Sequence, residues 1–142
     1  GSNGLTVSPD GALVICQHGD RRIAKMNSGV ANPKPDFITL SGNFEGKKFN
    51  SPNDLVYAAN GDLFFTDPPY GLEQNIRDTL KELDFQGVYK LDKNGNTVLL
   101  TKEISYPNGI GVSPDGKKLY VSNTDFRNAA WMVYDLTPDH RI

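Results

Sequence analysis

One pattern recurs three times in the chain and limits the folds that it can adopt. Each copy has an Asn, an aliphatic residue two positions later, an apolar residue four positions later and a Gly eight positions later. The copies occupy residues 3–11, 53–61 and 108–116, so their starts are 50 and 55 residues apart. A period of this length is typical of proteins that repeat one small unit of secondary structure.

Further apolar runs follow each copy, with turn residues between them. The second runs are 13–16, 63–66 and 119–122, the third are 22–26, 87–91 and 131–136, and the fourth are 37–40 and 97–101. The runs are rich in Val, Ile, Leu and aromatic residues, and they are separated by Pro-Asp-Gly or Asn-Gly turns. These features predict short antiparallel strands joined by hairpins, with Gly or Asn at positive φ in the turns.

Four short strands at a period near 50 residues predict an all-β protein of the β-propeller class. Residues 1–142 would form a partial β-propeller of roughly three blades, each a four-stranded antiparallel sheet, with repeats beginning near residues 3, 53 and 108. A β-sandwich also has short strands, but it does not explain the constant Asn-to-Gly interval. The best helical candidate, residues 75–83, is short and falls in a loop.

Propellers usually close with four to eight blades, so a six-bladed ring with this period needs roughly 300 residues. We therefore expect the 142 residues to be about half of a ring, either as a fragment or as a chain completed by another copy. An open half leaves sheet edges unpaired, and unpaired edges promote association. Self-association through the end blades is the expected consequence.

Charge and composition argue against several classes of function. Fifteen Lys and Arg against seventeen Asp and Glu give a net charge of -2, whereas a nucleic-acid partner requires a clustered basic face. No apolar stretch approaches the 18 residues of a membrane-spanning helix, so we expect no membrane association. The single cysteine, Cys16, lies in an apolar run and is expected to be buried and inert. Both bacterial cytoplasm and periplasm are compatible with so little cysteine.

Candidate functional residues are expected to meet at one rim of the ring. A strand and its hairpin partner run antiparallel, so the start of the first strand and the end of the second lie on the same side. The residues at these positions are Asn3, Asn53 and Asn108, together with 17–18, 66–67 and 123–125. Carboxamide and carboxylate oxygens are the ligands that a hard cation such as Ca²⁺ prefers.

Three groups of motifs resemble a known family. Residues 3–7 with 16–22, 52–55 with 65–71, and 106–116 with 120–125 are similar to the gluconolactonase, senescence-marker-protein and luciferin-regenerating-enzyme family. Its bacterial gluconolactonase-like branch has the Thr-Asp-Pro-Pro-Tyr-Gly and Tyr-Pro-Asn-Gly elements. The resemblance covers essentially the whole chain. It implies a six-bladed propeller with one divalent cation in the channel, Ca²⁺ foremost and Zn²⁺, Mg²⁺ or Mn²⁺ as alternatives.

The resemblance also implies which residues bind the cation. Asn53 and Asn108 match two ligand positions of the family, while its two carboxylate ligands have no counterpart among these residues. The catalytic base is accordingly assigned to no residue of this chain. For Asn3 we expect only an Asx-turn hydrogen bond to its own backbone.

Three further residues are expected to line the entrance and bind substrate, namely His18, Asp67 and Tyr70. Each also has a structural alternative. His18 could be merely exposed or structural, Asp67 could end a strand edge before two prolines, and Tyr70 could serve packing.

The function that we expect is metal-assisted hydrolysis of a small-molecule substrate, a sugar lactone or related cyclic ester, in which the cation polarises the carbonyl. For residues 1–142 alone we expect weak or absent activity, since the carboxylates are missing. Two alternatives come from other classes, because a fold does not determine a function. One is a non-catalytic propeller that binds a partner, and the other is a metal-free enzyme of the strictosidine-synthase type.

Overall fold

The computed structural model describes all 142 residues, and its sheets are all antiparallel. Blade 1 consists of β1 (Leu5–Val7), β2 (Leu13–Gln17), β3 (Arg22–Met26) and β4 (Phe37–Ser41), in that order. Blade 2 consists of β7 (Leu55–Tyr57), β8 (Leu63–Asp67), β9 (Gly87–Leu91) and β10 (Thr97–Thr101). Blade 3 consists of β11 (Pro107–Val112), β12 (Lys118–Asn123) and β13 (Ala130–Asp135).

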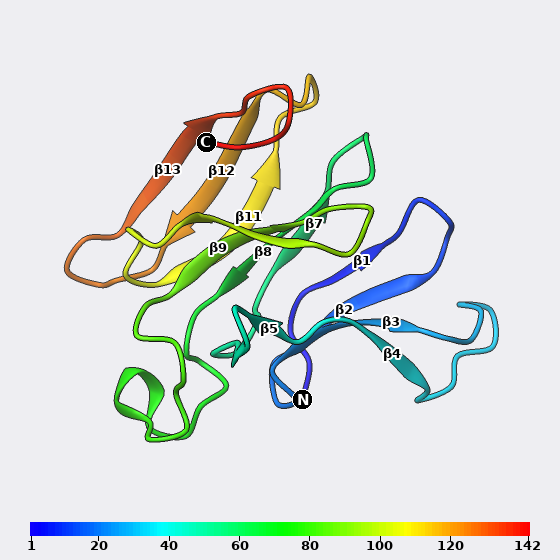
Figure 1. Cartoon of the computed structure of the whole chain (residues 1–142), viewed down its shortest axis with the longest axis horizontal. Helices are drawn as coiled ribbons and strands as arrows, with labels where there is room; N and C mark the ends of the chain where they lie inside the picture. Colours follow the sequence, from blue (N-terminus) through cyan, green and yellow to red (C-terminus); the bar gives the residue numbers. More distant parts are fainter.

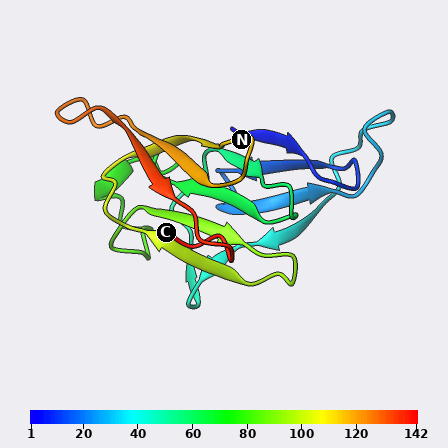
Figure 2. The ribbon, with the colours of Figure 1, turned by 90° about the horizontal axis from the view of Figure 1, so that it is seen from above.

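The three blades follow one another along an arc in chain order (Figures 1 and 2). Their innermost strands lie side by side, with β1 and β11 on either side of β7. This arrangement confirms the predicted all-β partial propeller. Asn3 and Asn53 stand two residues before β1 and β7, and Asn108 is the second residue of β11.

The recurring Gly has a conformational cause. Gly11, Gly61 and Gly116 adopt φ values of 85°, 92° and 71°, in the left-handed region that only Gly enters without strain. The amide of each glycine donates to the carbonyl oxygen three residues earlier, at 2.8 to 3.0 Å. The same hairpin turn therefore closes the first two strands of every blade, which explains the constant interval in the sequence.

Two elements differ from the predictions. A short hairpin of β5 (Asn43–Phe44) and β6 (Lys47–Lys48) was not predicted, because two-residue polar strands carry no apolar pattern. The segment 75–83 is helical only at η1, a single 3₁₀ turn over Asn75–Arg77, since Asp78 has extended backbone angles. The structure thus has no helix with the length and apolar character that a membrane crossing requires.

The blades pack by one rule of alternation. In the second strand of each blade, alternate side chains face the preceding blade or the following one. Val14 and Cys16 of blade 1 pack with Leu63 and Phe65 of blade 2 in one apolar cluster. Phe64 of blade 2 packs with Leu119 and Val121 of blade 3 in a second cluster. Burial of Cys16 also raises the pKa of its thiol, as expected for an unreactive cysteine.

The same rule leaves apolar side chains exposed at each end of the arc. On blade 3, Trp131 and Val133 of β13 pair with Ser122 and Tyr120 of β12. These residues lie on the side of the blade that, in blades 1 and 2, contacts the next blade of the arc. Trp131 is 87% exposed there, and Leu5 of blade 1 is 62% exposed at the opposite end. Contiguous apolar surfaces of this kind favour association.

Self-association through these faces stays a prediction, and Trp131 offers a test of it. A buried Trp side chain contributes strongly to interfaces, so we expect Trp131→Lys to weaken association at least ~10-fold. Sedimentation equilibrium over a range of protein concentrations measures the effect. Phe126→Lys is the matched control, because Phe126 is also 87% exposed but lies in the loop before β13 and not in a strand of the blade. Equal effects of the two substitutions would contradict an interface on blade 3.

Candidate functional site

Three carboxamide side chains form a continuous row at the rim. The Asn3 Nδ2 donates a hydrogen bond to Asn53 Oδ1, and the Asn53 Nδ2 donates to Asn108 Oδ1 at 2.7 Å. We call Asn3, Asn53 and Asn108 the carboxamide row. Asn53 is buried, Asn108 is half-buried and Asn3 is exposed. The predicted convergence of the three blades at one rim is therefore confirmed. The expectation of an Asx turn at Asn3 is wrong, because its side chain bonds to the neighbouring blade.

Repeated backbone contacts hold the row in place. The Asn3 amide donates to the Cys16 carbonyl oxygen at 2.9 Å, and the Asn53 amide makes the same contact with Thr66, also at 2.9 Å. The Gly4 amide then donates to the Asn53 carbonyl oxygen at 2.7 Å and joins blade 1 to blade 2. A β-carbon at Gly4 would lie 2.7 Å from that oxygen, so the close approach of the two blades requires glycine.

Blades 2 and 3 are joined beside the row by Thr66 and Asp54. The Thr66 hydroxyl donates to the Asn108 carbonyl oxygen at 2.7 Å. Asp54 accepts the Leu55 amide at 2.9 Å through Oδ1 and the Ile110 amide at 3.0 Å through Oδ2. Asp54 is half-buried, and its carboxylate connects blade 2 to blade 3.

The structure places Asp67 in the interior, which corrects its predicted position at the entrance. The side chain is fully buried, and its two oxygens accept the amides of Asn50 and Ser51, each at 2.8 Å. Burial raises the pKa of Asp67 to about 7, although these two hydrogen bonds and the charges of Arg21 and Lys81 act in the opposite direction. Asp67 thus holds the backbone of residues 50–51, and it has no access to a substrate at the rim.

Further hydrogen bonds hold residues 50–51, the segment that precedes Asn53. The Asn50 Nδ2 donates to the carbonyl oxygens of Asp67 at 3.0 Å and Phe85 at 2.9 Å. The Ser51 hydroxyl donates to the Pro68 carbonyl oxygen at 2.6 Å and accepts the Gly71 amide at 2.8 Å. The segment that leads into Asn53 is therefore tied to the end of β8 at several points.

Tyr70 lies at the rim and reaches from blade 2 to blade 3. Its hydroxyl is 2.5 Å from the Thr124 hydroxyl, and its ring is nearly parallel to that of Tyr106, with 6.2 Å between the centroids. Burial raises the pKa of Tyr70, and the Thr124 and Asn108 side chains beside the hydroxyl oppose that shift. Tyr70 is thus brought together with Asn108, at one end of the carboxamide row.

His18 lies against Gly71, the residue that follows Tyr70 in the chain. A β-carbon at Gly71 would lie 3.2 Å from the ring Cγ of His18, so the imidazole packs against the loop that follows Tyr70. The side chain is half-buried, and its Nδ1 is buried without a hydrogen-bond partner. Because this nitrogen is buried, a molecule at the rim could contact His18 only through the accessible part of its ring.

The donors at the rim suit a hard cation but supply little charge. Each carboxamide oxygen has two lone pairs, so Asn53 Oδ1 and Asn108 Oδ1 can each accept one hydrogen bond and still bind a cation. No group of three or more His, Cys, Asp or Glu side chains converges in the protein. The residues present therefore fit the neutral portion of an oxygen-ligand site, and further ligands would have to be waters or other residues.

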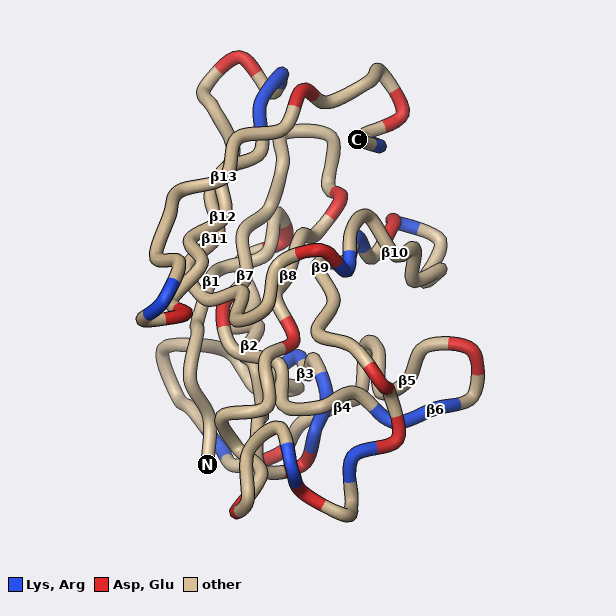
Figure 3. The backbone as a smooth tube through the Cα atoms, turned by 90° about the vertical axis from the view of Figure 1, so that its left-hand side faces the viewer, with Lys and Arg blue, Asp and Glu red and all other residues tan.

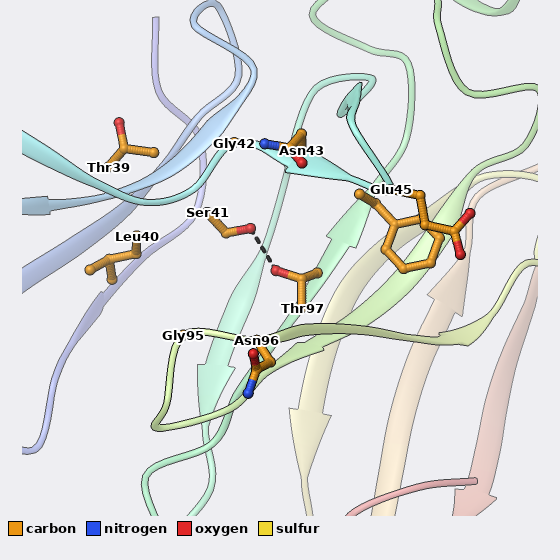
Figure 4. Close-up of a pocket in the computed structure, with 10 residues that line it drawn as sticks. Thr39, Leu40, Ser41, Gly42, Asn43, Glu45, Gly95, Asn96 and Thr97 are labelled. Atoms are coloured by element: carbon orange, nitrogen blue, oxygen red, sulfur yellow. Dashed lines mark hydrogen bonds between the residues drawn. The ribbon is translucent and has the colours of Figure 1, made fainter.

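A large cavity elsewhere in the molecule is not part of this rim. It has a volume of about 630 Å³ and lies between residues 39–45 and 95–97, at the outer strands of blades 1 and 2. Ser41 and Thr97 are hydrogen-bonded there at 2.7 Å (Figure 4). Glu45 is the one titratable side chain that lines it.

Charges of both signs lie close together along the loops of the chain (Figure 3).

Two features of the rim were not found from the sequence. The side-chain bond of Asn3 was missed because an Asn before Gly at a strand start also fits an Asx turn. The pairing of Tyr106 with Tyr70 was missed because the two aromatics are far apart in the sequence. Their positions next to prolines, at Pro69 and Pro107, were the available signal, and it is weak.

Comparisons with known proteins agree with this geometry. The profile of the SMP-30/Gluconolactonase/LRE-like region matches residues 1–142. The gluconolactonase of Zymomonas mobilis subsp. mobilis is 40% identical over 136 residues, which cover 96% of this chain and 37% of that protein. A solved gluconolactonase of Xanthomonas campestris has a TM-score of 0.84 at 32% identity and is matched over 98% of this chain and 46% of its own.

A protein from the alternative class is also similar. Protein STRICTOSIDINE SYNTHASE-LIKE 7 of Arabidopsis thaliana is 29% identical over 119 residues, which cover 80% of this chain and 32% of that protein. The chain thus spans less than half the length of these relatives. Because the family profile covers every residue and the Zymomonas relative is 40% identical, the chain belongs to the SMP-30/gluconolactonase/LRE-like family.

Proposed function

We propose that a complete propeller containing blades 1 to 3 is a lactonase that hydrolyses sugar lactones or related cyclic esters and uses one divalent cation. The observation that carries the proposal is the carboxamide row, in which the side chains of Asn53 and Asn108 are hydrogen-bonded to each other at the rim of a member of this family. Two relatives, the gluconolactonases of Zymomonas and Xanthomonas, support the substrate class.

Asn53 and Asn108 are the residues that would hold the cation in this chain. Ca²⁺ is the favoured ion because it accepts neutral carboxamide oxygens and several waters, whereas Zn²⁺ prefers His and Cys and the chain offers no such cluster. When bound, the cation supplies Lewis-acid polarisation of the lactone carbonyl. The protein keeps both amides in fixed positions through the contacts of Asn53 with Thr66 and of Thr66 with Asn108.

Substrate contacts are proposed for three side chains at the rim, those of Tyr70, Tyr106 and His18. The Tyr70 hydroxyl, beside Thr124 and Asn108, is placed to exchange a hydrogen bond with a sugar hydroxyl. The stacked rings of Tyr70 and Tyr106 offer an apolar surface to the C–H face of the sugar. His18 is the second candidate for a polar contact, through the part of its half-buried side chain that reaches the surface, since its Nδ1 is buried. The base that activates water is assigned to no residue here, and Asp67 is excluded by its burial.

Hydrolysis of glucono-δ-lactone, followed with a pH indicator, tests the proposal on the ring that contains these blades. We expect turnover that is lost with a chelator and restored by Ca²⁺. Removing one ligand oxygen with Asn108→Ala should lower kcat/KM about 100-fold or more, because ligand and near-ligand residues have effects of this size. Asn32→Ala is the matched control, since Asn32 is exposed in the loop between β3 and β4.

Each part of the proposal has its own contradicting result. Turnover that is unaffected by chelator would contradict the proposed role of the divalent cation and favour the metal-free alternative. Absence of lactone hydrolysis with Ca²⁺ present would contradict the proposed lactonase activity and favour a non-catalytic propeller that binds a partner. Strong chelator-sensitive turnover by a monomer of residues 1–142 would contradict the expectation that the missing carboxylates are needed.

A further inference from the structure

The carboxamide row has a direction, and Asn3 begins it. Asn3 donates through Nδ2 to Asn53 Oδ1, and Asn53 in turn donates through Nδ2 to Asn108 Oδ1. Asn3 lies on the blade for which the family resemblance implied no ligand. Its main chain is held on both sides, by the bond of its own amide to Cys16 and by the bond of the Gly4 amide to the Asn53 carbonyl.

The direction matters because a carboxamide has two ends of similar shape and opposite polarity. Rotating the Asn53 side chain by half a turn would place its nitrogen against the Asn3 nitrogen and its oxygen against the Asn108 oxygen. Two donors would then face each other, and so would two acceptors. The bonds at both ends of Asn53 therefore select one orientation, and only Asn3 supplies the donor for the Oδ1 end.

We propose that Asn3 is a positioning residue that sets the orientation of the Asn53 carboxamide and thereby prepares the cation site. This inference rests on the proposed function. Asn53 Oδ1 keeps a second lone pair after accepting the Asn3 amide, so orientation by Asn3 is compatible with a cation on the same oxygen. Asn3 itself is exposed and acts through Asn53.

The loss of Asn3 should leave the fold intact and loosen Asn53. The backbone bond of residue 3 to Cys16 does not depend on the side chain, and alanine can occupy an exposed position before a strand. Without the amide donor, Asn53 can turn its nitrogen toward the space that Asn3 leaves. Outer-shell partners of metal ligands typically change affinity 10–100-fold. We expect about a 10-fold loss, at the lower end of that range, because water can replace part of an exposed donor.

Nuclear magnetic resonance of the ¹⁵N-labelled chain provides two separate readouts. In the absence of metal, Asn3→Ala should shift the side-chain NH₂ signals of Asn53 and Asn108, while Asn32→Ala should leave them unchanged. In a Ca²⁺ titration, the dissociation constant should rise about 10-fold for Asn3→Ala and stay at the wild-type value for Asn32→Ala. Unchanged side-chain signals in metal-free Asn3→Ala would overturn the positioning role.

The substitution Asn3→Asp distinguishes positioning from direct binding. A carboxylate at this position has no donor for Asn53 Oδ1, so the Asn53 nitrogen should turn toward it and its NH₂ signals should move. If residue 3 were itself a ligand, the added charge would tighten Ca²⁺ binding while the Asn53 signals stayed in place, and the inference would be wrong. The wild-type chain could bind no Ca²⁺ while Asn3→Ala still shifted the Asn53 signals. That result would contradict the cation binding of the proposed function and would support the orientation of Asn53 by Asn3.

Discussion

The Asp67→Asn substitution is expected to lower the free energy of unfolding by about 3 kcal/mol. In the wild type, one carboxylate oxygen accepts the Asn50 amide and the other accepts the Ser51 amide, each at 2.8 Å. An asparagine keeps one acceptor but turns an NH₂ group toward the other backbone amide, and that amide is buried without a partner. Chemical denaturation measures the loss.

A matched control separates this effect from a general change of charge. Asp84→Asn removes the same charge from an exposed position, and it should change stability by less than about 0.5 kcal/mol. If Asp67→Asn were as stable as Asp84→Asn, the contact of Asp67 with residues 50–51 would not contribute to the fold. The Asn3, Asn53 and Asn108 side chains should also lose their fixed NH₂ signals in Asp67→Asn, because Asn53 follows the segment that Asp67 holds.

Asp67 also predicts how the stability depends on pH. Burial raises its pKa to about 7 in the folded protein, above its ordinary value of 3.8. Between these values the folded chain binds a proton that the unfolded chain has released, so stability falls as the pH rises from about 4 to above 7. The carboxylic acid form still accepts an amide through its hydroxyl oxygen, which a carboxamide nitrogen does not. Denaturation at a series of pH values should show this fall in the wild type, and Asp67→Asn should lack it.

The second large effect is expected at Gly87, where alanine should cost about 3 kcal/mol or prevent folding. A β-carbon at Gly87 would lie 2.3 Å from two ring carbons of Tyr89. The ring has no room to move, because it is stacked on Phe65 with 5.2 Å between centroids and meets Phe49 edge-on, also at 5.2 Å. Overpacking at a fixed ring therefore displaces the core of blades 1 and 2.

Gly111→Ala is the control for Gly87→Ala. Gly111 also lies in a strand, but no atom is within 4 Å of an added β-carbon and its φ is not positive. We expect its stability to stay within about 0.5 kcal/mol of the wild type. Thermal unfolding of both variants makes the comparison, and equal midpoints would mean that the Tyr89 ring yields to the added methyl group.

The strands were predictable because their signals are local. A continuous apolar run that follows a turn glycine determines β2 and β8 within a few residues, and the same turn glycine recurs in each blade. The position of Asp67 was not predictable, because its partners Asn50 and Ser51 lie 17 and 16 residues earlier in a segment without an apolar pattern. Likewise, the antiparallel order of the strands predicted that Asn3, Asn53 and Asn108 converge. Which amide donates to which depends on side-chain orientation, on which the spacing carries no information.

The order of the blades has a consequence for local unfolding. Blade 2 has a neighbour on both sides, and β8 and β9 are buried along their whole length, whereas blades 1 and 3 each have one neighbour and expose Leu5 and Trp131 at the ends of the arc. In chains of repeated units, stability depends on contacts between neighbours, so a unit with two neighbours opens last. Amide hydrogens of β8 and β9 should therefore exchange most slowly. Because the carboxamide row has one residue in each blade, local unfolding of blade 1 or blade 3 would break its hydrogen bonds while most of the protein remained folded.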